Sequence, residues 1–289
     1  MRRELSISSE TAQLKSVVLG IGHDQGEELD INPVSKMHKE NGTYPTEEAI
    51  VKEIQTVEDA LTNEGIEVLR PSNMPRREQI FTRDIGFVID DKFIVANMLE
   101  PVRQAEIRGI KWLLDEIGSL NIIRIPDGAR VEGGDVIVHN EHVFVGISKR
   151  TNRQGFEFLK SQFPMRKFHA IEVLVTDDPK TNVLHLDCTF QPIGFDMAIL
   201  YEDGFKVKPQ AIYEVFPEDK LIKVDQDEMN RMFPNIFSIS PKKVLIEKGF
   251  KRLIDELTSK GIETIPVSYS ETSKLSGLLR CSTLPLSRV

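Results

Sequence analysis

The sequence predicts an α/β protein built as a five-bladed, pseudo-symmetric α/β propeller of ββαβ units. Three observations support this fold class: one pattern of elements recurs along the chain, several copies carry a turn signal between two short apolar segments, and no linker rich in proline, glycine or serine separates them. A single unit cannot bury its own apolar face, so the copies must pack in a stack or a ring. We expect one domain over residues 1–289. On periodicity alone, an ordinary α/β sheet with separate helices is an equal alternative.

The clearest copy of the pattern begins at Ile85. Two apolar segments, IGFVID and KFIVANM, flank the turn signal Asp90-Asp91, as in a hairpin. The segment NIIRIP at 121–126 supplies a closing strand. Between them, apolar residues recur at the spacing of a helix, namely Ile107, Ile110, Leu114 and Ile117. This copy therefore predicts one complete ββαβ unit.

The other four copies follow the same order with different regularity. Their expected strands are VVLGI and IEVLRP near the start, DVIVH, HVFVG and IEVLV next, TFQPI, MAILY and LIKV after residue 185, and NIFSI, VLIE and IETIPV near the end. Their expected helices carry Ile50, Ile54, Val57 and Leu61; Phe156, Leu159 and Phe163; residues 211–216; and Phe250, Leu253, Ile254 and Leu257. The count of five units follows from these segments.

Composition bounds the class of ligand and the compartment. The chain has 289 residues, 40% hydrophobic and 28% charged, with a formal net charge of −8. An acidic protein is a poor partner for phosphate backbones, so we expect no nucleic-acid ligand and favour a cationic one. No run approaches the ~18 apolar residues of a membrane span, and no apolar segment of a secretion signal follows the basic N-terminus. With two cysteines, Cys188 and Cys281, we expect a cytoplasmic protein without a disulfide framework.

Polar clusters occupy the junctions between the units. FTRD at 81–84 precedes the first strand of one unit, EGGD at 132–135 and HLD at 185–187 precede the next two, and Arg280-Cys281 precedes the last strand-like residues, STLPL. In a ring, the four clusters would converge at the axis. A converging set of cysteine, histidine and carboxylates is what covalent catalysis requires.

Each cluster also has a purely structural interpretation. Asp84 could form a surface ion pair, and EGGD could be a plain turn, since glycine readily adopts positive φ. His185 and Asp187 could be capping or hydrogen-bonding groups, and Cys281 could be a small buried hydrophobe. The position of all four clusters at repeat junctions favours a functional interpretation over these separate ones.

Two other sets of residues compete with this interpretation. Cys188 could be the nucleophile, but an extended stretch would point its side chain away from Asp187, so we favour Cys281. His139 and His142 resemble metal ligands, yet they lie in a hairpin turn, and the sequence has no HExxH or CxxC spacing. We therefore expect no metal. Neither GxGxxG nor GxxxxGK[ST] occurs, so nucleotide binding is not expected either.

FTRD, EGGD, HLD and a cysteine close to the C-terminus, in this order, resemble the guanidino-group-modifying enzymes. That superfamily includes arginine deiminases, dimethylarginine dimethylaminohydrolases and amidinotransferases, and the resemblance spans residues 81–286. It implies the pentein fold, a five-bladed α/β propeller, in agreement with the repeats. It also implies covalent chemistry on a small cationic guanidino substrate, without a metal or organic cofactor.

The resemblance assigns a role to each motif residue. By position, Cys281 would be the nucleophile, His185 the general acid and base, and Glu132 the residue that holds His185. The residues expected to bind substrate are Asp84 and Asp187 at the guanidinium nitrogens, Asp135 as a supporting carboxylate, Phe81 and Arg83 at the pocket, and Arg150 and Arg103 at a substrate carboxylate.

The sequence departs from individual members of the superfamily. The segment before the nucleophile, LSGLLRC, contains one glycine, Gly277, where the deiminases usually carry a glycine-rich run. The length of 289 residues leaves no room for the helical domain inserted in arginine deiminases and resembles that of the dimethylarginine hydrolases. Asp187, however, stands where those hydrolases typically carry lysine. An acidic residue suits a guanidinium with free N–H groups, so size and motif point to different relatives.

These residues suit a two-step mechanism. Two carboxylates can fix a guanidinium by charge-assisted hydrogen bonds, and the bound cation favours the thiolate. Attack by Cys281 and proton transfer by His185 would give an amidino-cysteine intermediate, which water converts to a ureido product. We therefore expect a hydrolase of an arginine-like or methylarginine substrate. The alternatives are an amidinotransferase, in which an acceptor amine replaces water, and a non-catalytic propeller that serves as a binding module. A homodimer is compatible with each.

Overall fold

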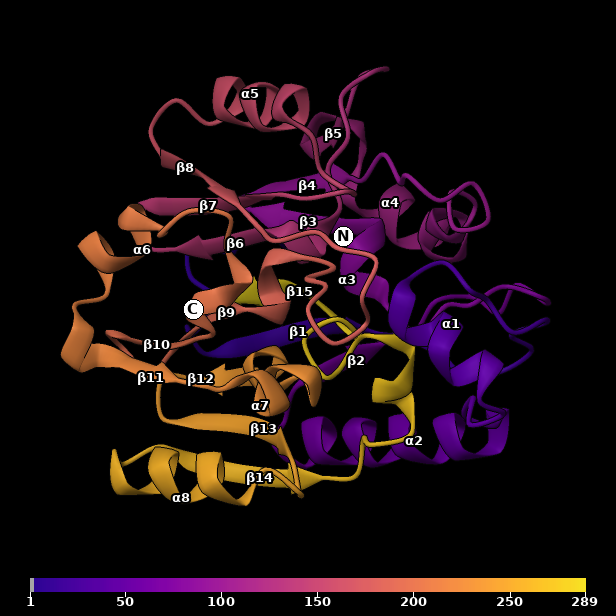
Figure 1. Cartoon of the computed structure of the whole chain (residues 1–289). Helices are drawn as coiled ribbons and strands as arrows, with labels where there is room; N and C mark the ends of the chain where they lie inside the picture. Colours follow the sequence, from indigo (N-terminus) through magenta and orange to yellow (C-terminus); the bar gives the residue numbers. More distant parts are fainter. Residues whose placement is uncertain (1–2) are drawn as a thin grey trace.

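Five three-stranded sheets form the computed structural model, which describes residues 3–289 (Figure 1). Their strand orders are β15-β1-β2, β3-β4-β5, β6-β7-β8, β9-β10-β11 and β12-β13-β14. In every sheet the middle strand pairs antiparallel with the first strand and parallel with the third. Each sheet with its helix is one ββαβ unit, called a blade below. The predicted five-bladed propeller is confirmed.

Four blades are continuous in the chain. The first two comprise β3 (Gly86–Ile89), β4 (Lys92–Val95), α4 (Lys111–Ile117) and β5 (Ile122–Arg124), then β6 (Val136–His139), β7 (His142–Ile147), α5 (Arg153–Gln162) and β8 (Lys167–Glu172). The next two comprise β9 (Phe190–Ile193), β10 (Met197–Leu200), α6 (Gln210–Val215) and β11 (Leu221–Lys223), then β12 (Phe237–Ser240), β13 (Lys243–Glu247), α8 (Lys251–Ser259) and β14 (Glu263–Val267). The two predicted turn residues Asp90 and Asn140 have φ of 54° and 52°, the left-handed conformation that tight hairpins require.

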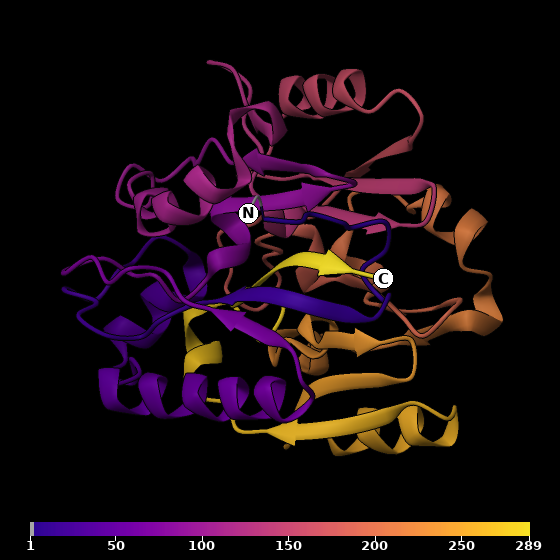
Figure 2. The same ribbon diagram turned by 180° about the vertical axis from the view of Figure 1, so that it is seen from behind.

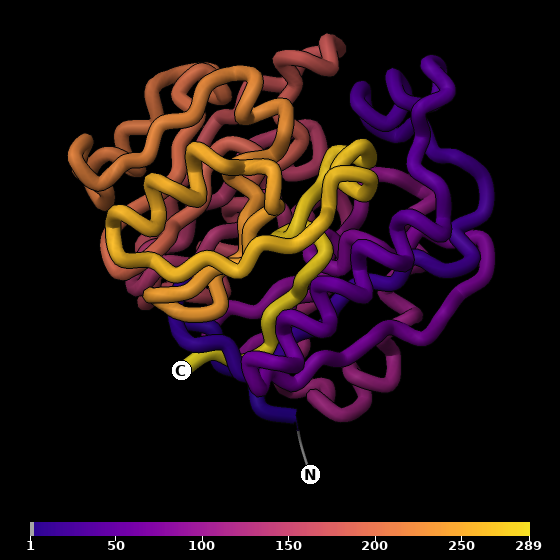
Figure 3. The backbone as a smooth tube through the Cα atoms, turned by 90° about the horizontal axis from the view of Figure 1, so that it is seen from below, coloured from indigo at the N-terminus to yellow at the C-terminus, as the bar shows by residue number. Residues whose placement is uncertain are grey.

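The fifth blade joins the two ends of the chain. β1 (Leu14–Leu19) pairs with the C-terminal strand β15 (Thr283–Arg288), and α2 (Glu47–Asn63) leads to β2 (Glu67–Leu69). Figures 2 and 3 show the yellow C-terminal segment beside the indigo N-terminal one. The ring is therefore closed by hydrogen bonds between the ends of the chain. The sequence predicts STLPL as a strand but does not identify this partner.

One predicted strand is displaced. The apolar run IEVLV at 171–175 is expected to close the second blade, but β8 occupies Lys167–Glu172 and pairs with the whole of β7. β8 is the outer strand of its sheet and carries half-buried polar residues such as His169, so apolar content is a poor guide to its bounds. Val173 lies beyond β8 and forms an isolated bridge with Phe205.

The helices of the blades lie toward the periphery of the ring (Figures 1 and 2). α2 begins at the N-cap Thr46, whose hydroxyl accepts from Ala49 N, and it buries the four predicted apolar residues Ile50, Ile54, Val57 and Leu61. α1 (Pro33–Glu40), which is not predicted from the sequence, begins at the N-cap Asn32 with proline in its first turn. No helix of the described residues is long and apolar enough to cross a membrane.

A short helical turn precedes the innermost strand of each blade. α3 (Thr82–Ile85), η3 (Gly133–Asp135), η4 (Leu186–Cys188) and η7 (Phe233–Asn235) precede β3, β6, β9 and β12, and a turn at 279–282 precedes β15. α3 packs against η3, η3 against η4, and η4 against η7. The remaining short helices are η1 (Glu106–Ile110), η2 (Ser119–Asn121), η5 (Glu202–Gly204), η6 (Glu218–Lys220), α7 (Gln226–Asn230) and η8 (Thr272–Leu275). The junction residues thus meet in the middle of the ring.

Candidate active site

The junctions enclose a small cavity. Six of the ten predicted site residues line it: Phe81, Asp84, Arg103, Arg150, His185 and Cys281. Its volume is about 10 Å³, room for one water molecule at most. Two loop segments form another part of the cavity wall. They are Ile31 and Asn32, just before α1, and Leu275 and Ser276, at the end of η8. A substrate can enter only if these walls move apart.

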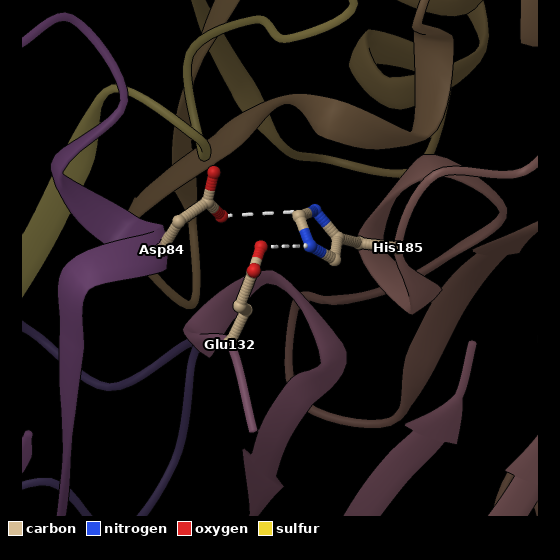
Figure 4. Close-up of side chains that lie close together, drawn as sticks. All are labelled: Asp84, Glu132 and His185. Carbon is tan, nitrogen blue, oxygen red and sulfur yellow. Dashed lines mark hydrogen bonds and ion pairs between the residues drawn. The ribbon is translucent and has the colours of Figure 1, made fainter. Parts of the chain in front are cut away.

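His185 lies between two carboxylates from neighbouring junctions (Figure 4). Its Nε2 is 3.0 Å from Glu132 Oε2, and its Nδ1 is 3.7 Å from Asp84 Oδ1. All three side chains are buried. Burial alone would lower the pKa of His185, but Asp84, Asp135 and Glu132 outweigh burial and raise this pKa to about 9. The imidazole is therefore protonated at neutral pH, as a general acid must be.

Glu132 is fixed on both carboxylate oxygens. Oε1 accepts a hydrogen bond from Leu99 N at 3.0 Å, and Oε2 accepts from His185 and, at 3.3 Å, from Arg150 Nη1. Burial favours the neutral acid, but the hydrogen bond from His185 and the charge of Arg150 lower the pKa of Glu132. Glu132 is therefore hydrogen-bonded to His185, and its role in catalysis stays a prediction.

Cys281 lies in the turn at 279–282 and is buried. Its Sγ is 3.6 Å from Asp187 Oδ2 and 3.2 Å from Asn235 Nδ2. Burial raises the pKa of the thiol well above its usual range, and the carboxylates of Asp187 and Asp84 raise it further. The protein without substrate therefore holds a neutral thiol, and a cation beside Sγ would favour the thiolate.

Asp187 faces the thiol rather than the cavity. Arg280 Nη1 donates to Asp187 Oδ2 at 2.7 Å, and Arg280 Nη2 donates to Glu10 Oε1 at 2.9 Å. Arg83 also approaches Glu10, at 3.4 Å, and does not line the cavity. Two buried arginines thus neutralise two buried carboxylates. Arg280 already binds Oδ2 of Asp187, so a guanidinium would share this carboxylate with Arg280, and the substrate-binding roles of Asp187 and Arg83 stay predictions.

Asp135 supports the His185 junction from outside the cavity. Its Oδ1 accepts from Leu186 N at 3.0 Å, and its Oδ2 accepts from Ser148 Oγ at 2.6 Å. Burial raises the pKa of Asp135 to about 6. Next to it, a Cβ at Gly134 would lie 2.6 Å from His185 Nδ1, so glycine is required for the close approach of this turn to the imidazole.

Arg103 and Arg150 line the cavity with protein partners of their own. Arg103 binds Glu106 through Nε at 2.8 Å and Asp84 Oδ2 through Nη1 at 2.7 Å. Arg150 binds Glu132. Several N–H donors of these two arginines are therefore already bound within the protein and cannot also bind a substrate carboxylate. Arg103 has fewer free donors than Arg150. Their role at a substrate carboxylate stays a prediction.

Three buried residues near the site were not identified from the sequence: Asn235, Glu78 and Glu10. Glu78 lines the cavity, and burial raises its pKa. Asn235 touches Cys281, and Glu10 binds Arg280. Of the three, Asn235 has a signal in the sequence, because it lies at the fifth junction, two residues before β12. Glu78 and Glu10 belong to no motif.

The expectation for Cys188 is wrong in one respect. Its side chain does not point away from Asp187: Sγ lies 3.7 Å from Asp187 Oδ1. Residues 186–188 form the short helix η4 rather than an extended strand, so side chains do not alternate there. Cys188 lines a separate small cavity with Met229 and Met232, and Cys281 lines the cavity that contains His185.

One group in the described part of the chain has the spacing of metal ligands, namely Asp84, Glu132 and His185, whose ligand atoms lie within 4.8 Å of one another. Glu132 and His185 already bind each other, as a catalytic pair would. His142, considered as a ligand from the sequence, instead pairs with His169 across β7 and β8 at 2.8 Å.

Comparison with known families agrees with this geometry. The sequence model described as "N,N dimethylarginine dimethylhydrolase, eukaryotic" matches residues 26–288. The chain belongs to this family. It is also 34% identical over 231 residues to the uncharacterized protein YkgA of Bacillus subtilis, which covers 80% of this chain and 77% of that protein. Arginine deiminase of Listeria monocytogenes is 27% identical over 248 residues, 72% of this chain and 60% of the deiminase.

Solved structures share the fold of this family member. The N-terminal domain of ArgZ, an arginine dihydrolase of cyanobacteria, superposes with a TM-score of 0.83 at 16% identity over 94% of this chain and 98% of that chain. SxtG, an amidinotransferase of Microseira wollei, superposes with a TM-score of 0.78 at 18% identity over 98% and 97%. The chain thus shares its fold with an arginine dihydrolase and with an amidinotransferase, and its sequence family places it in the guanidino-modifying pentein superfamily.

Proposed function

We propose that the chain hydrolyses the guanidinium group of an arginine-like or methylarginine substrate through a covalent intermediate on Cys281. One observation carries the proposal: Cys281, His185 and Asp84 line the same cavity. Such a reaction needs a nucleophile, a proton donor and an anionic partner for the cation, and these three residues have the required chemistry. The family match and the deiminase relatives support the same reaction class.

Binding begins with the cation. Asp84 Oδ1 is buried and has no hydrogen-bond partner among the described residues, so it is free to accept a guanidinium N–H. A second contact forms with Asp187, whose carboxylate the guanidinium shares with Arg280. The positive charge then lies next to Cys281 Sγ, where it lowers the pKa of the thiol and favours the reactive thiolate.

The first chemical step forms a C–S bond. The thiolate of Cys281 attacks the guanidinium carbon and gives a tetrahedral adduct. Collapse of the adduct breaks one C–N bond, and the departing nitrogen takes a proton from the imidazolium of His185. Ammonia or a methylamine leaves, and the rest of the substrate stays on sulfur as an S-alkylthiouronium group. His185 is now neutral and can act as a base.

The second step consumes water. Neutral His185 takes a proton from water as its oxygen attacks the same carbon, and collapse returns the electron pair to sulfur. The hydroxyl proton of this second adduct passes to the released amine or to solvent, so the product carries a neutral ureido group, and the thiolate and the imidazolium are restored. Glu132 stabilises the imidazolium whenever His185 is protonated, because its Oε2 accepts a hydrogen bond from Nε2 at 3.0 Å.

An amidinotransferase is the second candidate, and the enclosure of the site favours it. A cavity of about 10 Å³ leaves little room for bulk water around the intermediate. In that reaction the alkylamine part of the substrate would leave first, and a bare amidino group would remain on Cys281. An acceptor amine would then take the place of water.

The test is incubation with a panel of guanidines. The panel contains arginine, monomethyl- and dimethylarginine, agmatine and guanidino acids, and the assay measures ureido product and released amine. Cys281→Ala should abolish product formation. Cys188→Ala is the matched control, because it removes a second buried thiol next to the same carboxylate and should keep most activity. Product formation by Cys281→Ala, or no product from any guanidine with or without an acceptor amine, would contradict the proposal.

A further inference from the structure

Asn235 occupies the one junction to which the sequence motifs assign no function. It ends η7 and stands two residues before β12, as Asp84 stands two residues before β3 and Cys281 two residues before β15. It is fully buried. The pseudo-symmetry of the ring thus places an asparagine amide where other blades place a carboxylate and a thiol. The position raises the question of what this amide does at the site.

The side-chain amide of Asn235 is bonded on both ends. Oδ1 accepts hydrogen bonds from Leu278 N at 3.2 Å and from Cys281 N at 3.1 Å. It therefore fixes both ends of the segment 278–281, which carries the nucleophile. Nδ2 donates to Cys281 Sγ at 3.2 Å and to Asp187 O at 3.3 Å. Two backbone N–H groups face Oδ1, which fixes the orientation of the amide. A backbone hydrogen bond from Arg280 N to Asn235 O, at 3.1 Å, adds a third contact to this segment.

Most of the surroundings of Cys281 Sγ are unfavourable to a thiolate. Asp187 and Cys188 from η4 and Asp84 from α3 make the sulfur harder to ionise, as does its burial. The other titratable or charged groups that sense Cys281 or share its cavity are Arg83, Tyr269, His185, Glu78, Arg103 and Arg150. The positive groups among them are engaged with carboxylates. Two N–H groups act in the opposite direction: the backbone N–H of Leu278, which lowers the pKa of the thiol, and the side-chain amide of Asn235, whose Nδ2 lies 3.2 Å from Sγ.

We propose that Asn235 is a positioning residue that sets the reactivity of Cys281. Its Nδ2–H donates to the developing thiolate and stabilises it. Its Oδ1 fixes the turn at 279–282, which orients the sulfur toward the cavity. A hydrogen bond to the charged form of an acid favours that form, so loss of the donor should make the thiol a weaker acid. The inference rests on the proposed role of Cys281 as nucleophile, but its test needs no substrate.

The test is the pH dependence of Cys281 alkylation by iodoacetamide, with peptide mass spectrometry to separate Cys281 from Cys188. Asn235→Asp keeps the oxygen that binds Leu278 N and Cys281 N but replaces the donor by a second oxygen. We expect the alkylation midpoint to rise by at least ~1 pH unit, with a rate at neutral pH at least ~10-fold lower. Asn235→Ser keeps a neutral side chain of smaller size, and we expect a shift in the same direction.

Asn152→Asp is the matched control. The Asn152 amide has the same bonding pattern, because its Oδ1 accepts from Gly155 N and Arg130 N and its Nδ2 donates to Gly128 O, but it does not touch sulfur. Both substitutions can lower thermal stability, and only those at Asn235 should shift the alkylation midpoint. If circular dichroism shows that Asn235→Asp does not fold, the midpoint of Asn235→Ser decides the test.

An alkylation midpoint like that of the native protein in a folded Asn235 variant would overturn the inference. In turnover assays the variants should lower kcat and leave KM for the guanidine nearly unchanged, because the amide does not line the cavity. The two proposals can fail separately. A shifted midpoint in a protein that turns over no guanidine refutes the proposed function alone, and normal turnover with an unshifted midpoint refutes the role of Asn235 alone.

Discussion

Replacing Glu132 by glutamine would remove the negative charge next to His185 and keep the shape of the side chain. In the native protein Glu132 Oε2 lies 3.0 Å from His185 Nε2 and 3.3 Å from Arg150 Nη1. The amide of Glu132→Gln can still accept a hydrogen bond, but it no longer balances the imidazolium charge. We therefore expect the pKa of His185 to fall from about 9 toward its ordinary value of ~6.5.

The size of the effect follows from the linkage between protonation and folding. The folded-state pKa of His185 is raised, so its contribution to stability is complete below pH ~6.5 and is lost as the pH rises toward 9. The whole contribution is about 3 kcal/mol, and about 2 kcal/mol of it disappears between pH 6.5 and 8.5. The lowered pKa values of His139, His142 and His169 place the titration of these residues below pH 6.5. Glu106, whose pKa is raised to about 7 by burial, does titrate in this window. The contribution of His185 is therefore the difference between the loss in the native protein and the loss in a His185→Asn variant.

Urea unfolding at pH 6.5, 7.5 and 8.5 measures this loss directly. The native protein should lose about 2 kcal/mol more than His185→Asn across the window, and Glu132→Gln should lose less than the native protein, because only Asp84 and Asp135 then support the imidazolium. The basic limb of the kcat profile should also move to lower pH in Glu132→Gln, since general-acid catalysis contributes about 10²–10⁴-fold and needs the protonated imidazole. A native protein and a Glu132→Gln variant that lose stability in parallel would refute the assignment of this charge pair.

Three further predictions concern the surroundings of the site. Glu10→Gln removes a buried counter-ion from Arg280, and we expect a loss of ~3–5 kcal/mol in the free energy of unfolding, measured in urea at neutral pH. Gly134→Ala places a methyl group 2.6 Å from His185 Nδ1, so activity should fall at least ~100-fold in a protein whose circular dichroism spectrum is native-like. Asp84→Asn removes the unpaired buried oxygen, so KM for a guanidine should rise ~10–100-fold, and an unchanged KM would exclude Asp84 from guanidinium binding.

The fold was predictable because the apolar pattern repeats. Hairpins with Asp90 and Asn140 at their turns, each followed by an amphipathic helix, identify most blades by local signals alone. Those signals do not specify long-range pairing, so the closure of the ring by β1 and β15 was not predicted. An outer strand such as β8 is only half-buried, and its bounds therefore do not follow the apolar run.

The site was predictable to the extent that its residues stand in motifs at the junctions. Cys281, His185 and Asp84 line one cavity, as expected of converging junctions. The sequence could not show that Arg280 already binds Asp187, because that pair is formed by residues 93 positions apart. Asn235 was missed for another reason: an amide carries no motif, and only the position of its junction in the ring draws attention to it.

The formation of a covalent bond between Cys281 and the substrate is the central claim, and intact-protein mass spectrometry after rapid acid quench tests it most directly. With arginine or a methylarginine, a hydrolase should show an adduct of substrate minus ammonia or methylamine, mapped to the peptide that contains Cys281. An adduct of a bare amidino group on the same residue would identify the transferase. Turnover by Cys281→Ala, or an adduct on Cys188 instead, would contradict the account.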